Sequence, residues 1–231
     1  MRAYILCGGF GTRLSSVLNG SQKAVVDIHG QPFLALVLAQ LKLAGVTEAV
    51  LCAHYRADQM AALLPEMALE SGVALHLVIE DQPMGTGGAV LNALRALPAD
   101  DRFLVLNADT WLDQQAYRLA LNAPRDVLVA VQVEDRSRYG SLSVDDQQVL
   151  LGLEEKGMTG PGRVNGGVYG FSASTLSGFA VQPCSMEKEL LPNLIAARRM
   201  LICDYSGPFV DIGTPQALQF FKSARREGER S

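Results

Sequence analysis

The sequence predicts an α/β fold in which helices cover both faces of a mixed, mostly parallel sheet, giving three layers. Two observations predict it. In the first half of the chain, short apolar runs of strand length alternate with segments whose apolar residues recur at helical spacing. After Val133, strand-like runs follow one another across glycine-rich turns, which indicates a small antiparallel excursion.

The first half of the chain predicts strands and helices in near alternation. In the first helix, Leu34, Val37, Leu38 and Leu41 form one apolar stripe, and Gly45 is typical of a helix end. Strands are expected over residues 3–7, 49–53, 75–79, 103–106 and 127–133, and helices over 33–44, 56–64 and 88–97.

The second half predicts strands at residues 142–144, 149–153 and 164–171, which we expect to lie over one edge of the sheet. A helix over 186–198 and a strand over 200–205 follow. Thr214 and Pro215 form a hydroxyl cap followed by a first-turn proline, so they predict the start of a closing helix.

Size and composition limit the function classes. A chain of 231 residues fits a single domain, and its net charge of −4 lacks the basic excess of a nucleic-acid-binding protein. The four cysteines have no CxxC spacing, which predicts reduced thiols in a cytoplasmic protein. No run approaches the ~18 apolar residues of a membrane span. The sequence leaves a homo-oligomer open.

Three glycines, Gly8, Gly9 and Gly11, follow the first predicted strand. A dinucleotide fingerprint and a P-loop both fail on spacing, because Leu14 stands where the former needs glycine and no Gly-Lys-Ser/Thr follows. A loop whose backbone N–H groups face phosphates remains, with Arg13 as a cation. The alternative is a glycine-rich turn with solvated basic side chains.

The stretch GGFGTRL, residues 8–14, followed by Lys23, resembles the signature of the sugar-phosphate nucleotidyltransferases. The resemblance implies their Rossmann-like nucleotide-diphospho-sugar transferase fold. It also implies that the loop, including Leu6 and Thr12, binds a nucleoside triphosphate whose charge Arg13 and Lys23 neutralise. One departure is Ala24, where the family has a proline. Because proline would stiffen this segment, its loss predicts a looser Lys23.

Two aspartates are candidate metal ligands. Asp109 follows the buried strand 103–106, and Asp211 follows a short apolar run before the closing helix. The carboxyl ends of strands form the ligand-binding edge of such sheets, and Mg²⁺ typically takes one or two carboxylates plus phosphate oxygens. The resemblance assigns both positions to the metal. Read singly, each aspartate is equally a turn or cap residue.

Further motifs resemble the family's base and sugar contacts. The segment 80–89 resembles the family segment that lies near the base and the sugar, and the match includes Gly85 and Thr86. Glu80 is either an acceptor for a guanine edge or a solvated carboxylate. For the sugar phosphate the resemblance implies Glu155, Lys156, Asn165, Gly167 and Glu187. The alternative for Glu155 and Lys156 is a charged, solvated strand end. For Asn165 and Gly167 it is a β-bulge with a capping Asn. For Glu187 it is a favourable contact with the helix dipole.

The resemblance implies one domain, residues 1–231, with a nucleotide-binding part over about 1–134 and a sugar-binding part over about 135–215. It implies nucleotidyl transfer to a sugar 1-phosphate, with release of pyrophosphate. The branch most resembled uses GTP and D-glycero-D-manno-heptose 1-phosphate for surface polysaccharide synthesis. Mannose, glucose and N-acetylmuramate 1-phosphates, or a non-catalytic regulatory subunit, are the alternatives. His29, His54 and His76 match no metal spacing, so structural or surface roles are expected.

Overall fold

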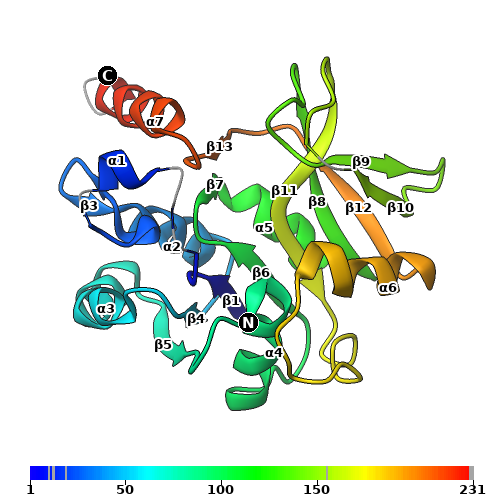
Figure 1. The fold of residues 1–231 in the computed structure, drawn as a ribbon, viewed down its shortest axis with the longest axis horizontal. Helices are drawn as coiled ribbons and strands as arrows, with labels where there is room; N and C mark the ends of the chain where they lie inside the picture. The colour runs from blue at the N-terminus through cyan, green and yellow to red at the C-terminus, as the bar shows by residue number, and fades with distance from the viewer. Residues whose placement is uncertain (10, 12–13, 19, 155, 229–231) are drawn as a thin grey trace.

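The first strand lies in the middle of a nine-stranded mixed sheet (Figure 1). The computed structural model describes residues 1–9, 11, 14–18, 20–154 and 156–228. On one side of β1 (Arg2–Leu6) lie β4 (Glu48–Ala53) and β5 (Ala74–Ile79), and on the other lies β6 (Phe103–Asn107). These four strands are parallel to one another, so their carboxyl ends meet at one edge of the sheet.

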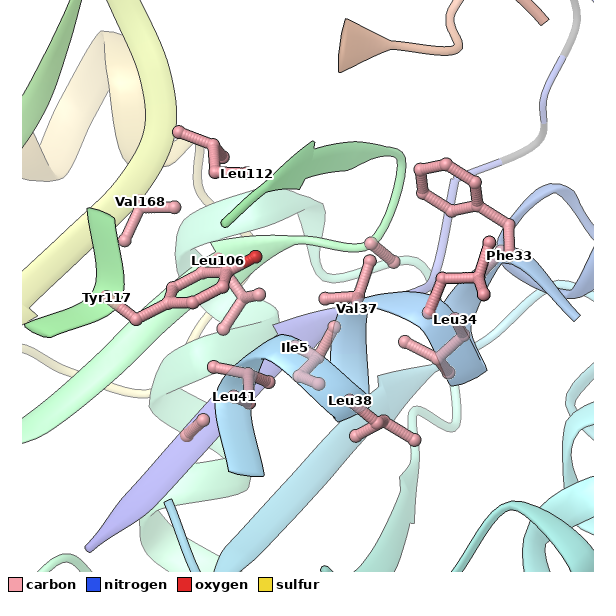
Figure 2. Close-up of a cluster of buried hydrophobic side chains, with 14 of the residues drawn as sticks. Ile5, Phe33, Leu34, Val37, Leu38, Leu41, Leu106, Leu112, Tyr117 and Val168 are labelled. Carbon is pink, nitrogen blue, oxygen red and sulfur yellow. The ribbon is translucent and has the colours of Figure 1, made fainter. Parts of the chain in front are cut away.

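Side chains alternate between two buried clusters because successive strand residues face opposite sides. Ile5 packs under α2 (Phe33–Leu43) and α5 (Gln114–Asn122), together with α3 (Ala57–Ser71) and α7 (Pro215–Gly228). Figure 2 shows Ile5 and Leu106 among the inward side chains of α2, with Tyr117 of α5. Tyr4 packs on the opposite face, under α4 (Gly85–Ala96) and α6 (Leu191–Ala196). The predicted three layers are confirmed.

The antiparallel strands differ in placement from the prediction. β9 (Ser141–Val144) and β10 (Leu150–Glu154) form a hairpin, but β11 (Gly162–Phe171) runs inside the sheet. One edge of β11 pairs with β6, and the other with β8 (Asp126–Val133), which in turn pairs with β12 (Met200–Tyr205). The expectation that all three strands lie over one edge was therefore wrong for β11. Its last six residues are all buried, as suits an interior strand.

Helix α3 continues past the predicted end at residue 64. Pro65 lies inside it, and the helix ends at Ser71 with Gly72, whose φ is +63°, as its C-cap. Buried Met67, on the turn after the proline, supplies an apolar contact that offsets part of the ~3 kcal/mol cost of an internal proline. The sequence prediction also lacked α5, which Asp113 caps by accepting from the Gln115 N–H.

Short elements complete the fold. They are α1 (Ser15–Leu18), the 3₁₀ turn η2 (Lys23–Val25), the β2–β3 pair (Asp27–Ile28, Gln31–Pro32), the β7–β13 pair (Thr110–Leu112, Phe209–Asp211) and the π-helical turn η3 (Met186–Leu190). η3 and α6 occupy the region predicted as one helix. None of the helices in the described part of the chain has the length and apolar character needed to cross a membrane.

Candidate active site

The carboxyl ends of β1, β4, β5 and β6 open into one cavity of about 380 Å³. Parallel pairing places the residue after each strand at the same edge, which is where ligands bind in open α/β sheets. The residues lining it are Leu6, Cys7, Gly8, Gly9, Gln22, Lys23, Ala24, His54, Glu80, Pro83, Gly85, Thr86, Ala89, Asn107, Ala108, Asp109 and Glu187.

The glycine loop borders this cavity through Gly8 and Gly9. A Cβ added to Gly8 would lie 3.4 Å from Glu80 Oε1, in ordinary van der Waals contact with the cavity wall. Gly11 has a φ of +61°, a conformation that favours glycine. Thr12 and Arg13 were predicted to contact the nucleotide, but they lie outside the residues that the structure describes.

Lys23 and Asp109 form an ion pair in the cavity wall, between Lys23 Nζ and Asp109 Oδ2. Lys23 is carried by η2, and Asp109 by the turn that follows β6. The predicted cation and one predicted metal ligand thus neutralise each other. An anionic ligand would replace Asp109 as the partner of Lys23, and its cation would replace Lys23 as the partner of Asp109.

Gln22 was not predicted as a site residue, although it holds the Lys23 segment in place. Its side chain is 2% exposed. The Nε2 group donates to the Cys7 carbonyl at the end of β1, and Oε1 accepts from the Ala24 N–H at 2.6 Å. Ala24 was predicted to leave Lys23 looser, but the Gln22 side chain holds this segment through the Ala24 N–H. A proline at position 24 would have no N–H for this hydrogen bond.

Asp211 lies beside Asp109, as predicted from the two strand ends. β13 pairs with β7 so that Asp211 lies opposite Thr110, and the Ile212 N–H donates to the Asp109 carbonyl at 3.0 Å. Burial raises the pKa of the Asp211 carboxyl, and the charge of Asp109 raises it further. A hydrogen bond from the Gly213 N–H opposes this shift.

Two lysine charges act on the same carboxyl. Lys23 and Lys156 both favour the ionised form of Asp211 and so lower its pKa. This brings Lys156, predicted to bind the sugar phosphate, into the electrostatic neighbourhood of the aspartates. Glu155 lies outside the described residues.

Glu80 is 6% exposed, so the alternative of a solvated carboxylate was wrong. Its Oε2 accepts from the Met84 N–H at 2.8 Å, and burial raises its pKa. His54, which was expected to be structural or at the surface, lines the cavity; its Nδ1 lies 3.1 Å from the Glu80 carbonyl oxygen. Its position directly after β4 was the signal that could have identified it.

The first turn of α4 is held by the backbone of Cys184. Its carbonyl accepts from the N–H groups of Gly87 and Gly88 at 2.9 and 3.1 Å. These two amides are therefore engaged within the protein and do not face a ligand. Gly85, with a φ of +68°, and Thr86 line the cavity.

Glu187 and Thr86 join η3 to the start of α4. Thr86 Oγ1 donates to Glu187 Oε2 at 2.9 Å and accepts from the Met186 N–H at 2.8 Å. The Ser185 hydroxyl also donates to Glu187 Oε2, at 3.2 Å. Two residues predicted from motifs 101 positions apart in the chain thus share one wall of the cavity.

Asn165 and Gly167 form a bulge in β11, where the register with β8 shifts. Asn165 Oδ1 accepts from the Gly167 N–H, and its Nδ2 donates to the Tyr169 hydroxyl, both at 2.8 Å. This matches the bulge alternative. Gly167 has a φ of +69°, and a Cβ there would lie 2.7 Å from Nδ2 of Asn107, a cavity residue that the sequence analysis missed.

The donor set suits a hard cation held mainly by its substrate. Among the described residues, no group of three or more His, Cys, Asp or Glu side chains is arranged to hold a metal. Asp109 and Asp211 together offer two carboxylates, and Mg²⁺ commonly takes one or two with phosphate oxygens and water.

Comparison with known proteins gives matches along nearly the whole chain. The model of the "Nucleotidyl transferase" family matches residues 2–226. The D-glycero-alpha-D-manno-heptose 1-phosphate guanylyltransferase of Campylobacter jejuni is 33% identical, over 96% of this chain and 98% of that protein. The catalytic subunit beta of the Drosophila melanogaster mannose-1-phosphate guanylyltransferase is also 33% identical, over 93% of this chain but 60% of that protein.

The fold has a solved counterpart. The crystal structure of HddC from Yersinia pseudotuberculosis superposes with a TM-score of 0.85 at 32% identity, covering 96% of this chain and 98% of that one. A second crystal structure of HddC, complexed with GMP-PN, gives a TM-score of 0.83. The predicted fold class and enzyme class are thereby confirmed. The chain belongs to the nucleotidyl transferase family.

Proposed function

We propose that this chain transfers the guanylyl group of GTP to D-glycero-D-manno-heptose 1-phosphate, giving GDP-heptose and pyrophosphate for surface polysaccharide synthesis. The observation that carries the proposal is a single cavity whose wall contains the glycine loop, Lys23 and Asp109, with Asp211 next to Asp109. Such a wall suits a triphosphate with its metal ion, because it offers a cation and backbone amides to the phosphate oxygens and carboxylates to the metal ion.

We infer that Asp109 and Asp211 hold a divalent cation, taken as Mg²⁺. The raised pKa of Asp211, caused by burial and by the Asp109 charge, supports this role, since a cation between two crowded carboxylates would relieve their repulsion. When bound, the cation would neutralise charge on the phosphates.

In the proposed reaction, an oxygen of the sugar 1-phosphate attacks the α-phosphorus of GTP in line. A new P–O bond forms, the bond between the α- and β-phosphoryl groups breaks, and pyrophosphate leaves with the electron pair. Lys23 and the backbone of Gly8 and Gly9 would bind the negative phosphate oxygens. Arg13 is assigned the same phosphate-binding role from its place in the motif. Positioning and charge neutralisation account for the rate, because the acceptor is already an anionic nucleophile.

Glu80 supports guanine as the base. One carboxylate oxygen accepts from the Met84 N–H, and the other lies near Gly8 at the cavity wall. Guanine carries an amino donor where adenine has none, so a buried acceptor favours GTP over ATP.

Glu80→Gln tests this base assignment. It keeps an acceptor for the Met84 N–H while replacing the second oxygen by a donor. We expect kcat/KM for GTP to fall by about 10- to 100-fold relative to ATP, the effect of one or two mispaired hydrogen bonds. Asp81→Asn, a matched change at the exposed neighbour, should leave the ratio unchanged. An unchanged ratio in Glu80→Gln would overturn the assignment.

The sugar side of the proposal rests on Lys156, Asn165, Gly167 and Glu187, with Glu155 carried from the motif. Residues 135–215 would thus form the sugar-binding part, and residues 1–134 the nucleotide-binding part. Lys156 is supported by its electrostatic reach to Asp211, and Glu187 by its place in the cavity wall. Asn165 and Gly167 would act by shaping the bulge that abuts the cavity residue Asn107.

Heptose is favoured over mannose by the extent of the matches. The Campylobacter relative is covered over 98% of its length, whereas the mannose-1-phosphate relatives from Drosophila melanogaster and Candida albicans are covered over 60% and 62%. A mannose 1-phosphate acceptor is the second candidate, because identity to those enzymes reaches the same 33%.

Pyrophosphate release with each pairing of GTP, ATP, CTP, UTP and dTTP with heptose, mannose, glucose and N-acetylmuramate 1-phosphates tests the whole proposal. We expect the highest kcat/KM for GTP with heptose 1-phosphate, and loss of turnover in EDTA. A higher value for another pair would reassign the substrate. Nucleotide binding without turnover for any pair would favour a non-catalytic regulatory subunit. We place the reaction in the cytoplasm, which the four free cysteines support.

A further inference from the structure

A second polar cavity lies at the opposite edge of the sheet from the candidate active site. It has a volume of about 210 Å³ and is lined by Arg102, Pro124, Arg125, Asp126, Ser172 and Arg199. We refer to it as the arginine cavity. Arg102 directly precedes β6 and Arg199 directly precedes β12, whereas Asp109 follows β6. The length of β6, about 17 Å for five residues, separates the two cavities.

The positive charges of the arginine cavity are held mainly by backbone carbonyls and are only partly offset by nearby acids. Arg102 donates through Nε to the Ala120 carbonyl at 2.9 Å and through Nη2 to the Arg125 and Gly170 carbonyls at 2.5 and 3.2 Å. Arg125 donates to the Arg198 carbonyl at 2.8 Å. Backbone carbonyls orient a guanidinium group without cancelling its charge. Burial lowers the pKa of Arg102, a sign that the charged form loses hydration here.

The one acid of the cavity lining has both carboxylate oxygens engaged in hydrogen bonds. Asp126 Oδ1 accepts from the Ser172 N–H at 2.9 Å, and Oδ2 accepts from the Thr175 hydroxyl at 2.6 Å. Arg199 Nη2 lies 3.8 Å from Oδ2, at the limit of an ion pair. Three guanidinium groups therefore line the cavity against one carboxylate, in a chain whose net charge is −4.

We propose that the arginine cavity binds a small anion carrying one or two phosphate groups. Guanidinium N–H groups are strong donors to phosphate oxygens, and the carbonyl contacts fix the orientation of two of these groups. They occupy Nε and Nη2 of Arg102 and Nη2 of Arg125, which leaves Nη1 of Arg102 and Nε and Nη1 of Arg125 to donate to the anion. A phosphate would supply the counter-charge that the lining lacks. The site is independent of the proposed function, since it shares no lining residue with the candidate active site.

Calorimetric titration with inorganic phosphate and with inorganic pyrophosphate, in EDTA and at constant ionic strength, tests the proposal. The test variant is the double substitution Arg125→Gln with Arg199→Gln. The matched control is Arg118→Gln with Arg163→Gln, which removes the same charge from arginines outside this cavity. All four side chains belong to residues on or near the surface, so folded variants are expected, and thermal unfolding verifies this.

We expect the cavity variant to weaken binding by about ten-fold or more, because a hydrogen bond to a charged group contributes about 1.5–3 kcal/mol. The control variant should change the binding affinity by less than about two-fold, because it removes only distant charges that salt screens. Weakening for both ligands identifies a single-phosphate site, and weakening for pyrophosphate alone identifies a diphosphate site. Equal loss in both variants, or none in the cavity variant, would overturn the proposal. A crystal soaked with the tighter ligand must show it between Arg102 and Arg125.

Discussion

Gln22→Ala is the perturbation that most directly tests how the fold positions Lys23. The substitution removes both hydrogen bonds of the Gln22 amide, to the Cys7 carbonyl and the Ala24 N–H. Cys7 and Ala24 are 2% and 1% exposed, so both backbone groups are left without a partner. Each such group costs about 1–3 kcal/mol. Water entering the vacated space limits the loss, and we expect about 2 kcal/mol in total.

This loss has two separable consequences. For a chain of this size, about 2 kcal/mol lowers Tm by about 4–8 °C. In addition, Lys23 follows Gln22 directly, and a displacement of about 1 Å in a positioning group can lower the rate about 100-fold. We therefore expect kcat to fall by about 10- to 100-fold in a variant that still folds.

Ala24→Pro in the Gln22→Ala background separates positioning from stability. Proline has no N–H, so it removes one of the two unsatisfied groups, and its fixed φ suits the 3₁₀ turn η2. We expect kcat to recover most of its loss, while Tm recovers only about half because the Cys7 carbonyl stays unpaired.

Pyrophosphate release gives kcat and KM, and calorimetry gives Tm. Gln40→Ala is the matched control, because Gln40 also bonds a backbone N–H, that of Gln114 at 3.1 Å, but does not line the active-site cavity. It should lower Tm without lowering kcat. A normal kcat in Gln22→Ala, or no recovery on adding Ala24→Pro, would refute the positioning role.

Three further predictions concern the aspartates and the bulge. Asp109→Asn should lower turnover at least about 100-fold with the fold retained; unchanged pyrophosphate release would exclude a metal role. Because the folded state raises the pKa of Asp211, its ionisation destabilises the protein above that pKa and has no effect below the unfolded value of about 4. Asp211→Asn should thus have a higher Tm than the wild type at pH 7 but not near pH 3, and it should abolish turnover. A Tm equal to that of the wild type at both pH values would contradict this. Gly167→Ala, at φ +69° and with its Cβ 2.7 Å from Asn107, should destabilise by about 1–3 kcal/mol in denaturant titration, and a wild-type midpoint would contradict it.

The parallel half of the fold was predictable because its information is local. The strand from Phe103 was expected to within a residue of its observed end, since a buried parallel strand appears as a continuous apolar run. The proximity of Asp109 and Asp211 was expected from strand ends that share one edge, but the structure makes it through the separate antiparallel pair β7–β13. The position of β11 was not predictable in the same way, because its pairing with β6 and β8 is set by long-range contacts.

The site residues that the sequence analysis missed act through tertiary contacts. Gln22 has no motif of its own, and its role depends on the Cys7 carbonyl 15 residues away. His54 and Asn107 line the cavity only because β4 and β6 flank β1. The engagement of Gly87 and Gly88 by Cys184 was likewise hidden, since it joins segments about 100 residues apart.

The central claim is a cation-bridged site for a triphosphate at the carboxyl edge of the sheet. Anomalous diffraction from a crystal grown with Mn²⁺ and a non-hydrolysable GTP analogue measures it directly, because Mn²⁺ replaces Mg²⁺ at oxygen-ligand sites and scatters anomalously. The account predicts an anomalous peak in contact with Asp109 and Asp211, with phosphates against Gly8 and Gly9. A peak elsewhere, or phosphates bound away from the glycine loop, would contradict it.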